Sequence, residues 1–360
     1  MIKRDLVIVG SGPAGLSAAK IALEAGIKVT IIERAHVLGG QLVKQTHKFF
    51  GSKSEYAKTR GIDIARILIN ELKDYSNLEI LKDATVVGMY PDYVITIYME
   101  NQYLKYKARS IIIATGASEK FLAFENNDLP GIYGAGAVQT LMNQYGIIPA
   151  KEVVMVGSGN IGLIVSYQLI QAGVKVKAVL EASSHIGGYL VHAAKLVRLG
   201  VPILTRTTVK RANGNKRLES IETIKLDDSW KEIPNTETKI DCDALCISVG
   251  LTPLHQLLSM ANIDMVYINE LGGLVPKKNE DYETSMSGVF VCGDVTGIEE
   301  ASSAMIEGKI AGLMASKTLN KQHKYFYELK EKYLNQLNNL RQGPSGTKIR
   351  IGLKKVGEAN

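Results

Sequence analysis

Short apolar runs, glycine-rich turns and amphipathic stretches follow one another along the chain in a fixed order. The apolar runs 6–9 and 153–156 each precede a glycine-rich turn. After each turn comes a segment with apolar residues at helical spacing that ends at Ala-Gly, and then a second apolar run. Strand, turn, helix and second strand in this order predict a βαβ unit, which opens a doubly wound parallel sheet. The pattern therefore predicts an α/β fold with two such units.

The two units form an internal sequence repeat. Residues 5–33 read DLVIVGSGPAGLSAAKIALEAGIKVTIIE, and residues 152–181 read EVVMVGSGNIGLIVSYQLIQAGVKVKAVLE. Both copies contain G-x-G-x-x-G, a third glycine followed by leucine, Ala-Gly and Lys-Val. A single G-x-G-x-x-G is a weak signal, but two copies in full strand–turn–helix–strand context strongly predict two dinucleotide-binding units.

Each glycine of the motif is expected to have its own role. The first permits the tight turn, the second lets a pyrophosphate approach the backbone, and the third lets helix and strand pack closely. The helix N-terminus then presents unpaired N–H groups to the phosphates. The residues expected to do this are Gly10, Gly12, Pro13, Ala14 and Gly15 in the first copy, and Gly157, Gly159, Asn160, Ile161 and Gly162 in the second.

An acidic residue at the end of the second strand differs in spacing between the copies. Glu33 lies 23 residues after Gly10 (33 − 10), where a carboxylate can accept protons from adenosine ribose hydroxyls. In the second copy that position is Leu180, and Glu181 comes one residue later. A slip of one residue turns a strand side chain to the other face unless the strand ends or bends first. The second site therefore stays open at this point. An acid there would favour NAD over NADP, because it would repel the 2′-phosphate.

Later segments complete each unit in outline. β-Meanders are expected over 78–116 and 201–250, the second ending in one apolar strand over 242–249. A late apolar strand near 282–291 leads into Cys292-Gly293-Asp294, and a helix is expected over about 301–316.

Charge is concentrated at one end of the chain. The 360 residues carry 43 basic and 36 acidic side chains, a net charge of +7. Residues 321–360 hold nine bases and three acids, or +6, which leaves +1 for residues 1–320. The nearly neutral body argues against a nucleic-acid-binding protein. Neither the length nor the apolar fraction of 46% departs from a globular chain of about two domains.

The C-terminal residues carry an apolar stripe. Its intervals of 3, 4, 4 and 3 residues predict a helix over 322–341. Gly343 and Pro344 end it, and an extended segment is expected over 348–355. The stripe packs on this chain, docks on a partner subunit or lies on an anionic membrane surface, and the sequence leaves these alternatives open. Its members are Phe326, Leu329, Tyr333, Leu337 and Leu340.

No apolar run reaches the roughly 18 residues that span a bilayer. Lys3 and Arg4 before the first apolar run loosely resemble a signal peptide, but glycines soon interrupt that run. We therefore expect a first core strand and a cytoplasmic protein.

The cysteines and histidines suggest neither a disulfide nor a metal site. Cys242 and Cys246 fall in one expected strand, where four residues span about 13 Å, beyond the roughly 7 Å that a disulfide allows. With Cys292 they are expected to be buried. The six histidines lack metal-ligand spacing.

Together these motifs resemble the two-dinucleotide-binding-domain flavoproteins of the pyridine nucleotide–disulfide oxidoreductase superfamily, over about residues 3–320. The resemblance implies two Rossmann-like, three-layer domains, each with a β-meander. An FAD domain at 1–117 and 246–320 would be interrupted by an NAD(P) domain at 118–245, with a basic tail at 321–360. The motifs are GSGPAG with Glu33, Gly39-Gly40-Gln41, Ala114-Thr115-Gly116, GSGNIG, Ser248-Val249-Gly250 and Gly293-Asp294.

The resemblance also implies which residues hold the cofactors. Asp294 would accept hydrogen bonds from the flavin's ribityl hydroxyls, and the helix that starts near Glu300 would direct N–H groups at the flavin. His47, in the loop after Gly40, is a weak candidate for a proton donor near the flavin. Besides the first glycine motif, the FAD site would contain Glu33, Arg34, Gly40, Gln41, Val86, Ala114, Thr115, Gly116, Gly293, Asp294, Glu300 and Ala301. Besides the second motif, the NAD site would contain Glu181 and Gly250.

A narrower resemblance rests on residues 131–140, the displaced Glu181, Gly187-Gly188 and residues 293–301. These are similar to the FAD-binding subunits of hydrogen cyanide synthase, opine oxidase and dye-linked proline dehydrogenase, and to NADH-oxidase-like and sarcosine-oxidase-alpha-like proteins. The resemblance implies a component of a larger complex that oxidises amines or amino acids.

The cysteine inventory restricts the electron path. Residues 39–50 and 118–160 contain no cysteine, so a dithiol relay like that of thioredoxin reductase is excluded, and no cysteine cluster for an iron–sulfur centre exists. The leading hypothesis is an FAD-dependent oxidoreductase that exchanges hydride with NAD(H) or an amine-type substrate. It would pass electrons to an external acceptor as a subunit of a complex, and the expected partners are other subunits or further copies of this chain in a homo-oligomer. The alternatives are a free-standing NADH:acceptor reductase and a non-catalytic FAD-containing electron-transfer or assembly subunit.

Overall fold

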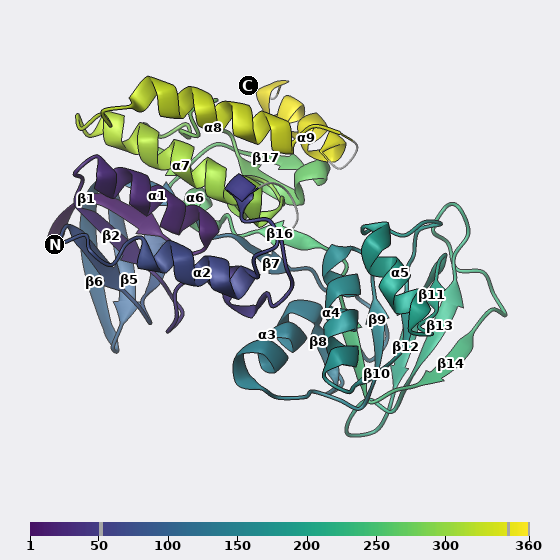
Figure 1. Cartoon of the computed structure of the whole chain (residues 1–360). Coiled ribbons are helices and arrows are strands. Elements are labelled where there is room, and N and C mark those ends of the chain that lie inside the picture. Colours follow the sequence, from purple (N-terminus) through teal and green to yellow (C-terminus); the bar gives the residue numbers. More distant parts are fainter. Residues whose placement is uncertain (50–52, 344–345, 359–360) are drawn as a thin grey trace. The chain divides into compact units, whose positions relative to one another are not determined.

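The computed structural model describes residues 1–49, 53–343 and 346–358. The chain divides into two compact units, one formed by Met1–Ser118 with Thr252–Asn360 and the other by Glu119–Leu251 (Figure 1). β15 (Ala244–Ile247) pairs within the sheet of the second unit. The return of the chain to the first unit therefore follows residue 251, slightly later than the expected boundary at 246.

The first unit is built on a sheet of order β3-β2-β1-β6-β5-β4, with β19 also pairing with β6. The first half of β6 pairs antiparallel with β5, and its last residues pair parallel with β19, so one long strand joins the meander to the parallel sheet. β3 pairs parallel with β2, so the meander starts at β4 and not at residue 78. The strands are β1 (Ile2–Val9), β2 (Val29–Ile32), β3 (Leu78–Leu81), β4 (Thr85–Met89), β5 (Val94–Met99), β6 (Gln102–Ile113) and β19 (Val289–Val291).

Alternating residues of β1 point to opposite faces of this sheet, and both faces are buried. Leu6 and Ile8 join a core with helices α1 (Pro13–Glu24), α2 (Gly61–Asn70) and α7 (Ala301–Thr318). Val7 and Val9 join a second core with the meander and α6 (Gln256–Met260). Both faces are therefore covered, as a three-layer α/β unit requires.

Helices α1 and α7 pack against each other at unusually close range. A Cβ at Gly308 would lie 2.1 Å from the carbonyl oxygen of Ala14, and one at Gly312 would lie 2.4 Å from that of Ala18. Only glycine permits this approach, which places the middle of α7 against the first half of α1.

The C-terminal residues pack on the first unit. α8 (Phe326–Leu340) lies along α7 (Figure 1), and Phe326, Tyr333 and Leu337 are buried in the core that α7 shares. Of the three alternatives for the apolar stripe, the structure therefore shows packing on this chain. The extended segment expected over 348–355 is wrong, because α9 (Thr347–Glu358) is a helix.

The second unit is a parallel sheet of order β11-β10-β9-β15-β8 with a three-stranded antiparallel sheet, β12-β13-β14. The strand expected over 242–249 is present but shorter, as β15 (Ala244–Ile247), which contains Cys246 and begins two residues after Cys242. The other bounds are β8 (Ile132–Gly134), α3 (Ala135–Tyr145), β9 (Glu152–Val156), α4 (Asn160–Gln171), β10 (Lys175–Leu180), α5 (Leu190–Arg198), β11 (Ile203–Leu204), β12 (Thr207–Asn213), β13 (Ser220–Lys225) and β14 (Thr238–Asp241).

Short elements complete the chain. β7 (Ala117–Glu119) pairs with β16 (Leu251–Pro253), and β17 (Met265–Ile268) pairs with β18 (Gly273–Pro276). The 3-10 helices are η1 (Gly40–Lys44), η2 (Lys53–Glu55), η3 (Asn269–Leu271) and η4 (Asp294–Thr296). No helix in the described part of the chain is long and apolar enough to cross a membrane. The cytoplasmic location stays a prediction.

Candidate functional site

The first glycine-rich turn connects β1 to α1. Gly10 has a φ of 105°, and a Cβ there would lie 2.4 Å from the carbonyl oxygen of Ala114. A Cβ at Gly15 would lie 2.0 Å from the carbonyl oxygen of Gly10, whereas one at Gly12 would have no heavy atom within 4 Å beyond its chain neighbours. Gly12 is the N-cap of α1 and Pro13 follows it. The turn thus leaves an open space over backbone N–H groups at a helix N-terminus, which suits a pyrophosphate.

Glu33 lies at the end of β2 beside this turn. Its Oε2 accepts hydrogen bonds from the Ser11 N–H (2.9 Å) and Oγ (2.6 Å), and its Oε1 accepts one from the Ala35 N–H (2.8 Å). A carboxylate offers about four lone-pair sites, so Oε1 retains capacity for a ribose hydroxyl. The buried carboxylate fits the adenosine end of a dinucleotide.

The second glycine-rich turn repeats this geometry. Gly157 has a φ of 100°, and its Cβ would lie 2.2 Å from the Ser248 carbonyl oxygen. A Cβ at Gly162 would lie 2.2 Å from the carbonyl oxygen of Gly157, and Gly159 again faces open space. The N-terminus of α4 is therefore open to phosphates in the same way.

Glu181 makes the same contacts as Glu33. Its Oε2 accepts hydrogen bonds from the Ser158 N–H (2.9 Å) and Oγ (2.5 Å), and its Oε1 accepts one from the Ser183 N–H (2.9 Å). The extra residue before this acid does not turn its side chain away from the loop.

A β-bulge in β10 explains this result. Val176 pairs with Val153 and Ala178 pairs with Val154, so Lys177 is an extra residue on β10. Beyond it the register returns, and Leu180 pairs with Val156 as Ile32 pairs with Val9 in the first unit. The bulge absorbs the additional residue and restores the position of the acid.

A second glycine pair folds over each loop. The Gly39 N–H donates to the Ser11 carbonyl oxygen (2.9 Å), and the Gly188 N–H donates to that of Ser158 (2.8 Å). A Cβ at Gly40 would lie 2.7 Å from the Gly12 Cα. The repeat in structure thus extends from the glycine motif through the segment after the acid.

Asp294 follows Cys292 and Gly293 after the end of β19, where the sequence places it. Gly293 has a φ of 75°, and its Cβ would lie 3.0 Å from the Cβ of Ala14 on α1. Glu300 is the N-cap of α7 and Ala301 is its first residue. The structure therefore brings the late Gly-Asp turn beside the first glycine-rich turn.

The Asp294 side chain is partly buried. Burial raises the pKa of Asp294 to about 7, and the nearby Glu307 and Glu299 carboxylates add to this. The Glu299 N–H opposes it by donating to Asp294 Oδ1 at 3.5 Å. A group that supplied hydroxyl donors to this carboxylate would favour its ionised form.

The remaining predicted residues lie in several settings. Thr115 Oγ1 donates to the Leu254 carbonyl oxygen (2.8 Å), which fixes the turn after β6. His47 is partly buried and its ring stacks on Phe49 with centroids 5.9 Å apart, while its proton-donor role stays a prediction. Val86 on β4 is partly buried and packs against the core that contains the meander. Arg34, Gln41 and Ile161 are exposed. Asn160 accepts a hydrogen bond from the Tyr189 N–H, and Gly116 and Gly250 have positive φ.

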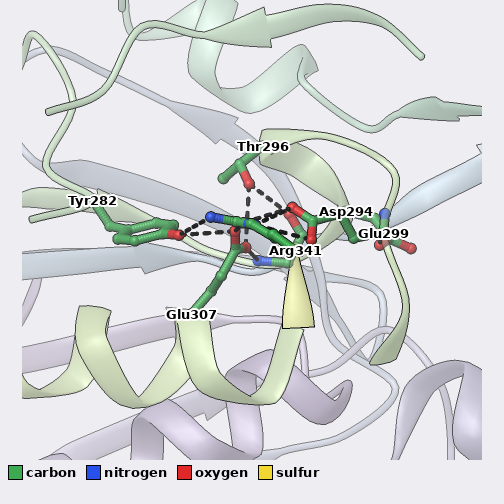
Figure 2. Close-up of polar contacts among 7 residues, drawn as sticks. Tyr282, Asp294, Thr296, Glu299, Glu307 and Arg341 are labelled. Atoms are coloured by element: carbon green, nitrogen blue, oxygen red, sulfur yellow. Dashed lines mark hydrogen bonds and ion pairs between the residues drawn. The ribbon is translucent and has the colours of Figure 1, made fainter. Parts of the chain in front are cut away.

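A buried polar cluster that the sequence did not predict lies beside Asp294 (Figure 2). Glu307 Oε1 accepts hydrogen bonds from the Tyr282 hydroxyl (3.0 Å) and Arg341 Nη2 (2.6 Å). Its Oε2 accepts from the Gly293 N–H (2.7 Å) and Thr296 Oγ1 (3.2 Å). One carboxylate of α7 thus joins the Gly-Asp turn to the C-terminal residues.

Arg341, just after α8, is shared between two carboxylates. Its Nη2 lies 2.5 Å from Glu299 and 2.6 Å from Glu307, and its Nε also donates to Glu299. Burial raises the pKa of Glu299, and Glu307 adds to this, while Arg341 opposes it. The one feature of the sequence that could have indicated this cluster is Glu307, an acidic residue within the largely apolar helix 301–318.

All three cysteines are buried and free. Burial raises the pKa of Cys242 to about 12 and that of Cys246 further. A buried thiol of high pKa is unreactive at neutral pH. Among the residues that the structure describes, no three histidine, cysteine or acidic side chains are grouped to hold a metal ion.

Similar proteins show the same architecture. L-proline dehydrogenase from P. horikoshii superposes with a TM-score of 0.68 and 22% identity, covering 92% of this chain and 59% of that chain. Thioredoxin reductase from T. acidophilum superposes with a TM-score of 0.72 and 22% identity, covering 89% and 100%. The expected fold of two Rossmann-like units is confirmed.

Curated relatives match most of this chain but only part of their own length. An opine oxidase subunit of Agrobacterium tumefaciens is 24% identical over 86% of this chain and 65% of its own length. The alpha subunit of sarcosine oxidase from a Corynebacterium species is 26% identical over 88% and 32%. The HcnB subunit of hydrogen cyanide synthase from Pseudomonas protegens is 26% identical over 85% and 69%. The resemblance to these subunits, inferred from the motifs, is confirmed.

The model of one protein family, the pyridine nucleotide-disulphide oxidoreductases, matches residues 4–308. That range contains both glycine-rich turns, both acids and the Gly293-Asp294 turn. The chain belongs to the pyridine nucleotide-disulphide oxidoreductase family.

Proposed function

We propose that the first unit holds FAD, that the second binds NAD(H), and that the chain passes electrons to an acceptor outside itself. The observation that carries this proposal is the equivalence of Glu33 and Glu181. Each accepts the N–H and hydroxyl of the serine in its own glycine-rich turn, although the spacing in sequence differs. Hydride transfer is chemistry that the flavin and nicotinamide rings supply when bound.

In the first unit, we assign each group to one part of the cofactor. The open space at Gly12 and the α1 N-terminus would take the pyrophosphate, and Glu33 would accept from the adenosine ribose. Asp294 would accept from the ribityl hydroxyls, and the N–H groups at Ala301 would face the flavin. The other assigned contacts are those at Ala14, Arg34, Gln41, Val86 and Thr115.

In the second unit, Glu181 favours NAD(H) over NADP(H). Its ionised carboxylate accepts protons from two ribose hydroxyls but repels a 2′-phosphate. Glu181 is partly exposed, whereas Glu33 is buried. A more open second site suits a nucleotide that binds and leaves in each turnover.

Electrons leave the flavin without a dithiol relay in this proposal. The chain contains three cysteines, all buried in the structure and none disulfide-bonded. A relay requires a thiolate that can attack a disulfide, and burial keeps these thiols protonated. The acceptor is therefore a small molecule or a cofactor held by another protein.

We infer an amine or amino-acid substrate class and a partner subunit from the relatives. Opine oxidase, sarcosine oxidase and hydrogen cyanide synthase are named as oxidases or a synthase, and the matching chains are named as subunits. A free-standing NADH:acceptor reductase remains the second candidate, because both nucleotide sites have complete loops. A non-catalytic FAD-containing subunit is the third.

Anaerobic reduction of the purified flavoprotein separates the two catalytic candidates from the non-catalytic one. NADH should bleach the visible flavin absorption, and bleaching by an amino acid or secondary amine without NADH would place substrate oxidation on this chain. An intact flavin that neither NADH, NADPH nor any such amine reduces would support the non-catalytic candidate and contradict the proposal.

The variant Glu181→Gln tests the second site. It keeps the shape of the side chain but loses the charged acceptor, worth about 1.5–3 kcal/mol in charge-assisted hydrogen bonds. We expect the NADH concentration for half-reduction to rise about tenfold and the preference for NADH over NADPH to narrow. Ser183→Ala, which keeps the backbone N–H donor to Glu181, is the matched control. Equal NADH affinity in Glu181→Gln and wild type would contradict the assignment.

A further inference from the structure

The positive charge of the C-terminal residues meets acids of the first unit. Lys330 on α8 pairs with Asp281 (2.5 Å), and Lys355 on α9 pairs with Glu270. Arg341, between these helices, pairs with Glu299 and Glu307. Of these three contacts, that of Arg341 is the most buried and the nearest in structure to the Gly293-Asp294 turn.

We propose that Arg341 is a positioning residue of the flavin site: through Glu307 and Glu299 it fixes the turn that carries Asp294. This inference rests on the proposed function, in which Asp294 binds the ribityl chain. It assigns the C-terminal helices to the cofactor site. These helices lie outside both glycine motifs and outside residues 4–308, the range that the family model matches.

Glu307 connects Arg341 to the turn. The same carboxylate that accepts from Arg341 also accepts from the Gly293 N–H and from Thr296 Oγ1, at the two ends of the Asp294 turn. Figure 2 shows Thr296 and Arg341 next to the Glu307 carboxylate. Gly293 has a backbone conformation that favours glycine and lies against Ala14. A shift of Glu307 would therefore move Asp294 relative to the first turn of α1.

The cluster depends on Arg341 for its charge balance. The exposed fractions of the side chains are 10% for Arg341, 10% for Glu299 and 3% for Glu307. Two buried carboxylates without a cation would take up protons or turn toward water. Lys278, another cation nearby, lies over the Tyr282 ring, with its Nζ 3.9 Å from the ring centroid. Arg341 is therefore the cation that bonds both carboxylates.

Helix α9 supports the same turn from another side. A Cβ at Gly352 would lie 2.6 Å from Leu271 Cγ, and one at Gly297 would lie 2.9 Å from Leu271 Cδ2. The Ile298 N–H donates to the Leu271 carbonyl oxygen (3.1 Å). Leu271 is thus in contact with α9 on one side and with the segment between Asp294 and α7 on the other.

The experiment compares three variants of the full chain with wild type. Arg341→Met removes the charge and keeps the aliphatic stem, and Arg341→Lys keeps a charge without the planar fork that bonds both carboxylates. Phe326→Leu is the control, because Phe326 is buried at the opposite end of α8. After the flavin is removed, the FAD dissociation constant and the thermal unfolding temperature are measured for each protein.

We expect Arg341→Met to raise the FAD dissociation constant at least about tenfold and Arg341→Lys to fall between it and wild type. Phe326→Leu should lower the unfolding temperature and leave the dissociation constant within about twofold of wild type. Arg341→Lys keeps the test usable if Arg341→Met does not fold.

Unchanged FAD affinity in both Arg341 variants would overturn the inference alone. Equal losses of affinity in Phe326→Leu and Arg341→Met, at equal losses of stability, would also overturn it, because Arg341 would then act only by holding α8. Failure of wild type to bind FAD would instead overturn the proposed function itself.

Discussion

The two glycine-rich turns are alike in geometry and differ in what surrounds them. In the first unit, the turn lies beside α7 and the Asp294 turn, and its acid Glu33 is 8% exposed. In the second unit, Glu181 is partly exposed. The repeat specifies the nucleotide-binding loop, and the elements outside the repeat set how firmly a nucleotide is enclosed. We expect the first cofactor to remain bound through purification and the second to exchange.

The largest effect is expected from alanine at the first glycine of either turn. Gly10 and Gly157 have φ values of 105° and 100°, and the new Cβ would lie 2.4 Å and 2.2 Å from a carbonyl oxygen. Strain and overlap should each cost about 1–3 kcal/mol. Gly10→Ala should lose flavin, whereas Gly157→Ala should keep flavin and lose reduction by NADH. Flavin content and anaerobic bleaching measure both, and loss of flavin in Gly157→Ala would break the independence of the two sites.

Alanine at the second glycine should affect cofactors more than stability. Gly12 and Gly159 have φ values of −69° and −66°, and an added Cβ has open space. The free energy of unfolding without cofactor should therefore stay within about 0.5 kcal/mol of wild type. The Cβ would occupy the approach of the pyrophosphate, so Gly12→Ala should weaken FAD about tenfold or more, and Gly159→Ala should do the same for NADH. Binding titrations measure the cofactor affinities and chemical denaturation measures the free energy of unfolding. Unchanged affinities for FAD and NADH would contradict the assignment of the pyrophosphate sites.

The buried Asp294 carboxyl group lowers the stability of the first unit at neutral and higher pH. Burial raises the pKa of Asp294 to about 7 from an ordinary 3.8, so the folded flavin-free protein holds this proton more tightly than the unfolded chain. Its contribution therefore lowers stability as pH rises from about 4 to about 7. Asp294→Asn should be more stable than wild type by about 2 kcal/mol at pH 8, with no difference near pH 4, and should bind FAD more weakly. Chemical denaturation at both pH values decides this, and equal stability of the two proteins at pH 8 would refute it.

Local patterns in the sequence predicted the nucleotide-binding loops well. The spacing of Gly10, Gly12 and Gly15 directly implies a tight turn, an open approach and close helix packing, because each depends on a missing Cβ. The structure shows all three features. The position of Glu181 could not be predicted in this way. The spacing shows one extra residue, but the pairing between strands decides whether a bulge absorbs it.

The long-range contacts of the C-terminal residues could also not be predicted from the sequence. The charge of +6 was visible, but its destination depended on acids at 270, 281, 299 and 307, which only the fold brings near. The extended segment was mispredicted because alternating Ile349 and Ile351 resemble a strand. In the structure Ile349 and Val356 lie on one face of α9 and pack near Leu271. Packing decided between two periodicities that a short segment cannot separate.

The smallest effect, and the sharpest test of the equivalence of the two acids, is expected from deleting Lys177. If this residue is the bulge, its removal gives β10 the regular register of β2 and leaves Glu181 in place. NADH affinity should then stay within about threefold of wild type. The free energy of unfolding should fall by less than about 1 kcal/mol, because the ion pair between Lys177 and Glu152 is lost. Deleting Ala178 instead gives a chain of the same length but moves Lys177 into a buried position. That control should be unstable. If deleting Lys177 abolished NADH binding while the protein still folded, the extra residue would be required to place Glu181 at the ribose. The two acids would then be positioned differently, and the two sites would not be equivalent.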